Sequence, residues 1–66
     1  MNGGVVLAEI SEKGEQMMGI AIDEAYLLAL NRYAFEHGLI TEEEFQKMKI
    51  NIRISTKRKL DELKDR

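Results

Sequence analysis

Three consecutive glutamates, Glu42 to Glu44, come nearest in this sequence to a catalytic or metal-binding cluster. Successive side chains on a helix diverge by about 100°, because an α-helix has about 3.6 residues per turn. Three adjacent carboxylates therefore do not converge on one ligand. Helix capping explains them instead, since negative charge in a first turn faces the positive end of the helix dipole. We predict no metal site and no acid–base pair here.

His37 is the only histidine, and its neighbour Glu36 points to a different side of a helix. The chain has no cysteine, which excludes a disulfide framework and a Cys/His zinc site. No serine has a histidine at workable spacing, and no glycine-rich phosphate loop follows a strand. We therefore expect no catalytic residue, no metal and no cofactor, and we do not expect an enzyme.

A basic segment covers residues 47–59. Nine acids and two bases give residues 1–45 a net charge of −7, whereas eight bases and three acids give residues 46–66 a net charge of +5. Clustered positive charge is typical of phosphate binding, but the net charge of −2 argues against strong binding to nucleic acid. A nucleic-acid-binding regulator is therefore the alternative function. Its contacts would be Lys47, Lys49, Arg53, Lys57, Arg58 and Lys59.

Residues 36–45 contain a helix stop followed at once by a helix start. Gly38 stands where a helix ends in the left-handed conformation that glycine adopts at little cost. Thr41 is an expected N-cap, and Glu44 three residues later completes a capping box. Two helices are therefore predicted to meet at a tight corner between Gly38 and Thr41.

Apolar residues beside this corner are expected to reinforce it. Leu39 occupies the position from which a side chain usually folds back onto the last helical turn. Ile40 and Phe45 occupy the two positions of a hydrophobic staple.

The first helix is predicted from Asp23, as N-cap, to about His37, and it is apolar over most of its circumference. Such a helix must be covered on more than one side, and a second helix can cover only one. The second helix is predicted from Thr41 to near the C-terminus. Its apolar stripe has a period of 3.6 residues and consists of Phe45, Met48, Ile52, Thr56, Leu60 and Leu63.

Two alternatives remain open within the second helix. Ile50, Ile52 and Ile54 alternate with polar residues, as they would in a strand over residues 49–55. A break near Ser55 and Thr56 would produce a third helix. The helix is favoured because the capping signal is strong and no Pro or Gly interrupts residues 41–66.

Residues 1–22 form an N-terminal arm that the sequence describes less clearly. Two short apolar runs flank Gly14, which favours a β-hairpin with the glycine in its turn. A helix interrupted at Gly14 fits nearly as well, because periodicity does not distinguish short apolar runs. The predicted fold is mostly α: an arm over residues 1–22, and a helical hairpin of two or three helices over residues 23–66.

The run Gly38-Leu-Ile-Thr-Glu-Glu-Glu-Phe45, with lysines just after it, resembles the SHOCT (short C-terminal) domain, over roughly residues 28–52. The arm and the basic extension depart from that family's usual pattern. The resemblance implies a small bacterial helical hairpin that acts in oligomerisation or protein interaction, and it implies no catalytic residues.

A chain of 66 residues buries only about 60% of its extended surface, so it needs support from a partner chain. We therefore expect a non-enzymatic oligomerisation or protein-interaction module. No apolar run approaches the roughly 20 residues of a membrane span, and the N-terminus lacks the basic region of a signal peptide, so we expect a cytoplasmic protein. The predicted interface residues are Tyr26, Leu30, Tyr33, Ile50, Ile52 and Ile54.

Overall fold

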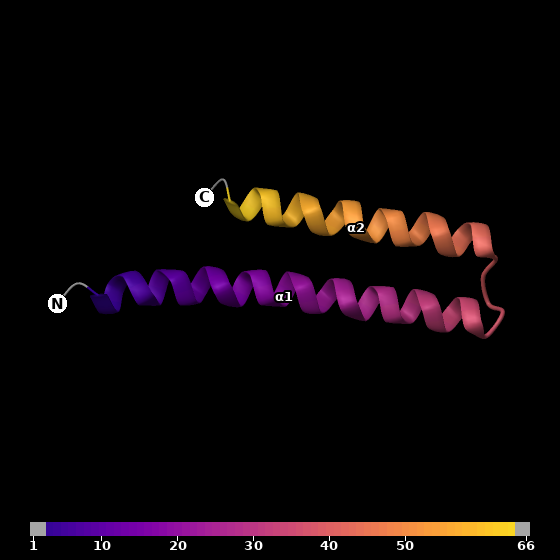
Figure 1. Ribbon diagram of the computed structural model, residues 1–66, viewed down its shortest axis with the longest axis horizontal. Coiled ribbons are helices and arrows are strands. Elements are labelled where there is room, and N and C mark those ends of the chain that lie inside the picture. Colours follow the sequence, from indigo (N-terminus) through magenta and orange to yellow (C-terminus); the bar gives the residue numbers. More distant parts are fainter. Residues whose placement is uncertain (1–2, 65–66) are drawn as a thin grey trace.

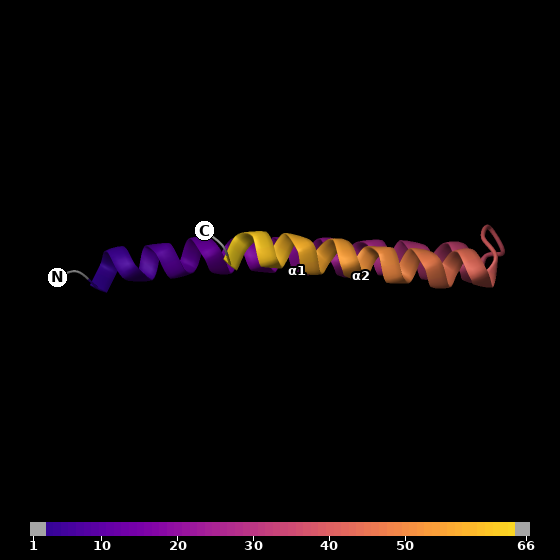
Figure 2. The same cartoon turned by 90° about the horizontal axis from the view of Figure 1, so that it is seen from above.

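The computed structural model describes the backbone of residues 3–64 and the side chains of residues 12–64. Two helices, α1 (Gly3–Glu36) and α2 (Glu42–Lys64), lie antiparallel and are joined by one tight turn (Figure 1). The molecule measures 57 × 20 × 8 Å, so it is a single layer of two helices (Figure 2). The predicted helical hairpin is confirmed for the described residues.

The C-terminal end of α1 is a Schellman motif. Gly38 has a φ of 70°, in the left-handed region. The Leu39 N–H donates to the Ala34 carbonyl at 2.8 Å, and the Gly38 N–H donates to the Phe35 carbonyl at 3.1 Å. The predicted helix stop is therefore confirmed. Leu39 is 70% exposed, so most of its side chain is not covered by the last turn.

The N-terminal end of α2 is the predicted capping box. The Glu44 N–H donates to Thr41 Oγ1 at 3.1 Å, and the Thr41 N–H donates to Glu44 Oε1 at 2.9 Å. Phe45, at the staple position, stacks its ring on Phe35 with ring centroids 4.6 Å apart. This stacked pair joins the last turn of α1 to the first turn of α2.

Helix α2 is continuous from Glu42 to Lys64, as its apolar period predicted. Neither the alternative strand over residues 49–55 nor a third helix forms within the described residues. Thr56 lies inside α2, where its Oγ1 donates to the Ile52 carbonyl at 3.0 Å instead of capping a new helix.

The β-hairpin predicted for residues 1–22 is not supported, because residues 3–22 are helical and form no strand. Asp23, the predicted N-cap, lies inside α1, which therefore runs through the predicted boundary between arm and hairpin. A Cβ at Gly14 or Gly19 would meet nothing within 4 Å. Glycine inside a helix costs only about 1 kcal/mol relative to alanine, so neither residue need interrupt α1.

Helix α1 is 11 residues longer than α2, at 34 residues against 23. Gln16 and Ile20 lie beside Lys59 and Leu63 at the C-terminal end of α2. The N-terminal part of α1 therefore extends beyond the end of α2 (Figure 1).

Candidate interaction surface

The seam between the two helices contains one buried polar residue, Asn31. Its side chain is 7% exposed, and its Nδ2 donates to the Phe45 carbonyl at 3.0 Å. Residues of α1 that are buried or half-buried recur every three or four positions, which defines the face that meets α2. They are Ile20, Glu24, Leu28, Asn31, Ala34 and Phe35.

From α2, the predicted stripe supplies the other half of the seam. Phe45, Thr56 and Leu60 are half-buried, whereas Ile52 and Leu63 are 7% and 8% exposed. Met48, also predicted for this stripe, is 50% exposed at the edge of the seam. No described side chain is fully buried, so the described part of the hairpin has a seam and no enclosed core.

A second apolar face of α1 lies on the side away from α2. Ile22, Tyr26 and Tyr33 each follow a seam residue by two positions, which is about 200° around the helix. The exposed fractions of Met18, Ile22, Tyr26 and Tyr33 are 64%, 59%, 63% and 58%. We call this surface, from Met18 to Tyr33, the outer face of α1.

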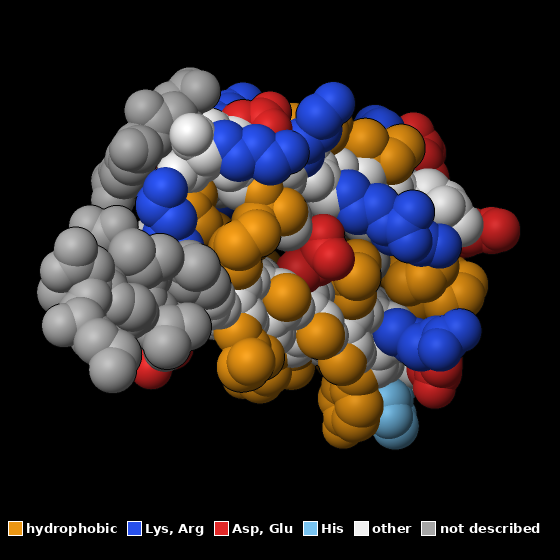
Figure 3. Space-filling view, turned by 60° about the vertical axis from the view of Figure 1, so that its left-hand side comes forward, with side chains coloured by type: hydrophobic (Ala, Val, Ile, Leu, Met, Phe, Trp, Pro, Cys, Tyr) orange, Lys and Arg blue, Asp and Glu red, His pale blue; other side chains and the backbone are white. Residues whose placement is uncertain are grey.

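The space-filling view shows where apolar and basic side chains lie on one side of the hairpin (Figure 3). In Figure 3, hydrophobic side chains gather mainly along α1, which is the lower helix, and lysine and arginine side chains lie mainly over α2 above it. The apolar surface and the positive charge are therefore concentrated on different helices.

An open apolar groove of about 400 Å³ runs along one edge of the seam. Leu27, Leu30 and Met48 line it and are 44%, 47% and 50% exposed. Ile52 lies at its base. The groove therefore continues the exposed apolar surface from the outer face of α1 towards α2.

The six predicted interface residues separate into four locations. Tyr26 and Tyr33 lie on the outer face of α1, and Leu30 lines the groove. Ile50 and Ile54 are 57% and 52% exposed on the far side of α2. Ile52 is not available to a partner on that side, because it is buried in the seam.

The predicted interface did not include four further exposed apolar residues, Met18, Ile22, Leu27 and Met48. Met18 and Ile22 were placed outside the first helix, because that helix was predicted to begin at Asp23. The 3.6-residue period, continued back from Tyr26 through Ile22 to Met18, is the signal that identifies them.

The basic segment does not lie on one surface. Lys47 Nζ lies 3.2 Å from Glu43 Oε1, and Lys49 Nζ lies 5.9 Å from the centre of the Phe45 ring. Arg58 and Lys59 are exposed on other sides of α2. Lys49, Arg53 and Lys57 follow one another at four-residue spacing and so share one flank.

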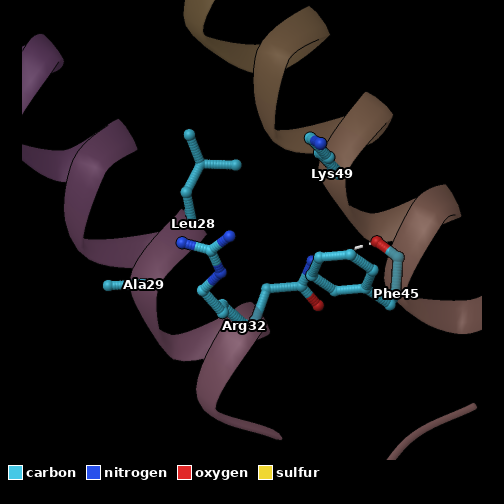
Figure 4. Close-up of a pocket in the computed structure, with 6 residues that line it drawn as sticks. Leu28, Ala29, Arg32, Phe45 and Lys49 are labelled. Carbon is cyan, nitrogen blue, oxygen red and sulfur yellow. Dashed lines mark hydrogen bonds between the residues drawn. The ribbon is translucent and has the colours of Figure 1, made fainter. Parts of the chain in front are cut away.

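Arg32 of α1 joins Lys49 at the edge of a shallow pocket (Figure 4). Its Nε lies 3.5 Å from Glu36 Oε1. Leu28 and the Phe45 ring also line the pocket. The pocket thus places two cations from different helices beside an aromatic ring.

The glutamate triplet has the capping role predicted for it. The hydrogen bond from the Thr41 N–H lowers the pKa of Glu44, with smaller contributions from the Thr41 hydroxyl and Lys47. Glu43 pairs with Lys47. His37 stacks on Tyr33 with ring centroids 4.0 Å apart. Glu43, Glu44 and His37 therefore each make a contact within the hairpin.

Among the side chains of residues 12–64, no three of His, Cys, Asp or Glu come together as they would around a metal ion. Neither described helix has the length and apolar character needed to cross a bilayer. No protein-family model, no curated protein and no solved structure matches this chain.

Proposed function

We propose that the chain is a non-enzymatic interaction module that completes its fold by associating with itself or with a partner protein. One observation carries the proposal: the hairpin exposes far more surface than a compact protein of its mass. Its accessible surface is 5669 Å², whereas a compact monomer of 7.6 kDa exposes about 4,300 Å².

The dimensions of the hairpin support the same proposal. Its radius of gyration is 16.4 Å, against about 11 Å for a compact domain of this length. The excess surface of about 1,400 Å² exceeds the roughly 800 Å² that each partner buries in a standard interface. One further apolar surface would therefore bring the chain to the burial expected of a stable domain.

The resemblance to the SHOCT domain agrees with this proposal, since that family implies oligomerisation or protein interaction. The Schellman motif and the capping box form the corner that such a helical hairpin needs. We also propose that the protein is bacterial and cytoplasmic. The resemblance supports the first, and the cysteine-free sequence supports the second.

Light scattering behind size exclusion, at about 0.1 M and about 1 M salt, tests self-association. We expect a multiple of 7.6 kDa at both salt concentrations, because contacts between apolar surfaces are not screened by ions. A mass of 7.6 kDa at every protein concentration, with full helical content by circular dichroism, would contradict self-association.

A second candidate is binding to nucleic acid along the flank of α2 that carries Lys49, Arg53 and Lys57. The observation in its favour is Arg32, which adds a cation from α1 beside Lys49. Retention on heparin at low salt is expected under this candidate. Replacing Arg53 and Lys57 by Ser would reduce that retention more than replacing Arg58 and Lys59, because only the first pair shares the flank. Passage through heparin at low salt would remove the candidate.

A further inference from the structure

We infer that a second copy of this chain packs its α1 against the outer face of α1, so that two hairpins assemble with the α1 helices inside and the basic α2 helices outside. This inference rests on the proposed self-association and specifies the surface and the partner. Its basis is the chemistry of the outer face, compared with that of the other exposed apolar surfaces.

The centre of the outer face of α1 carries no charged residue from Met18 to Tyr33. Glu15 and Glu36 lie on this side of the helix beyond the two ends of the face, and Asp23 and Arg32 lie along its two edges. Interface centres are depleted of charge, because a charge that is buried without a partner is costly. A copy of the same face can therefore cover its centre without burying a charge there. Its members are Met18, Gly19, Ile22, Ala25, Tyr26, Ala29 and Tyr33.

Large and small side chains alternate on this face. Ala25 and Ala29 lie within one turn of Tyr26, and Ala29 lies one turn before Tyr33. Small residues between large ones let two helices approach and interdigitate. A two-fold dimer uses the same patch on both chains, which matches a face that carries both its knobs and its holes.

The apolar pair on the far side of α2 is a poorer interface. On a helix, Ile54 is flanked by Lys57 and Arg58, three and four residues later. Ile50 likewise has Arg53 three residues later. A second copy that covered this pair would desolvate cations and set like charges against each other, so the far side of α2 is expected to remain exposed.

Two isoleucines provide a matched pair of variants. Ile22 on the outer face and Ile54 on α2 are 59% and 52% exposed, and both lie inside helices. Ile22→Asp places one carboxylate from each chain in the interface. It is expected to weaken dimerisation at least about 100-fold. Ile54→Asp is the control and is expected to change the dissociation constant by less than about threefold. Sedimentation equilibrium measures both constants.

The two tyrosines provide a readout that needs no mutation. The chain has no tryptophan, and its only tyrosines, Tyr26 and Tyr33, both lie on the outer face. Quenching of tyrosine fluorescence by acrylamide is therefore expected to increase as the wild-type protein is diluted through its dissociation constant. In Ile22→Asp, strong quenching is expected at every concentration.

Each outcome of these measurements decides the inference. Selective dissociation by Ile22→Asp, with tyrosines protected only in the assembled protein, supports it. Dissociation by Ile54→Asp alone or by both variants, or by neither, would overturn the assignment to α1 while leaving self-association standing. Quenching that does not change across a measured dissociation would overturn it as well. A wild-type protein that is monomeric throughout would remove both the inference and the proposed self-association.

Discussion

Asn31 offers the sharpest test of how the two helices are held together. Its Nδ2 donates to the Phe45 carbonyl across the seam, and its side chain is 7% exposed. Phe45 lies inside α2, so its carbonyl also accepts the helical hydrogen bond from the N–H four residues later. Removing the Asn31 amide therefore leaves no orphaned acceptor.

Two substitutions at this position separate the hydrogen bond from the packing. Asn31→Ala removes the hydrogen bond, worth about 0.5–1.5 kcal/mol, together with buried side-chain volume. We expect a total loss of about 1–2 kcal/mol, which lowers the melting temperature of a domain this small by about 4–16 °C. Asn31→Leu removes the same hydrogen bond but keeps the volume and buries more apolar surface, so we expect a change within about 1 kcal/mol of zero.

Urea unfolding followed by circular dichroism measures both differences. All three proteins are compared at one protein concentration, because the stability of a self-associating chain depends on concentration. A loss in Asn31→Leu as large as that in Asn31→Ala would refute the reasoning, since the hydrogen bond and not the packing would then dominate. A loss below about 0.3 kcal/mol in Asn31→Ala would show that the seam is not held at this residue.

Three further predictions concern the glycines and the helix cap. Gly38→Ala is expected to lower the free energy of unfolding by about 1–2 kcal/mol, because Gly38 has a φ of 70°. Gly14 lies in a helix with open space around it, so Gly14→Ala should raise the free energy of unfolding by about 0.5–1 kcal/mol. Thermal unfolding of both variants checks that the two changes have opposite signs. Thr41→Ala should lower the free energy of unfolding by about 1 kcal/mol, because the cap is lost. Thr41→Ser keeps the capping hydroxyl and should retain most of that stability in the same assay. Glu44 has a pKa lowered in the folded state, so its stabilising effect is present above the unfolded pKa and is lost as the pH falls through the folded pKa. The stability difference between wild type and Glu44→Gln should therefore shrink towards acid pH, and a difference that is constant with pH would contradict this role.

The hairpin on its own lacks the second packed layer that a protein domain usually has. Protein domains are built from packed layers around one hydrophobic core. This chain has one layer, and Ile52 and Leu63 are the only buried hydrophobic residues among the described side chains. An assembly that adds a second layer on the outer face of α1 would supply the missing core. It would also leave the positive charge of α2 exposed.

The corner between the helices could be predicted from the sequence because every interaction that builds it is local. The Schellman motif and the capping box join atoms no more than five residues apart, so residue type and spacing suffice. The stripe of α2 could be predicted for a related reason: six residues at a 3.6-residue period define one face whatever packs against it.

The structure decided which of the two apolar faces of α1 meets α2. Leu28, Asn31 and Phe35 form the seam, whereas Tyr26 and Tyr33 remain exposed. Both faces satisfy the same helical period, so the sequence alone does not rank them. The choice depends on contacts such as that between Asn31 and Phe45, which are 14 residues apart. The length of α1 was underestimated because Asp23 was interpreted as an N-cap and Gly14 as part of a turn, whereas both lie inside α1 and a glycine inside a helix costs only about 1 kcal/mol. Interactions between neighbouring residues thus determined where the chain turns, and contacts between distant residues determined which side of α1 remained exposed.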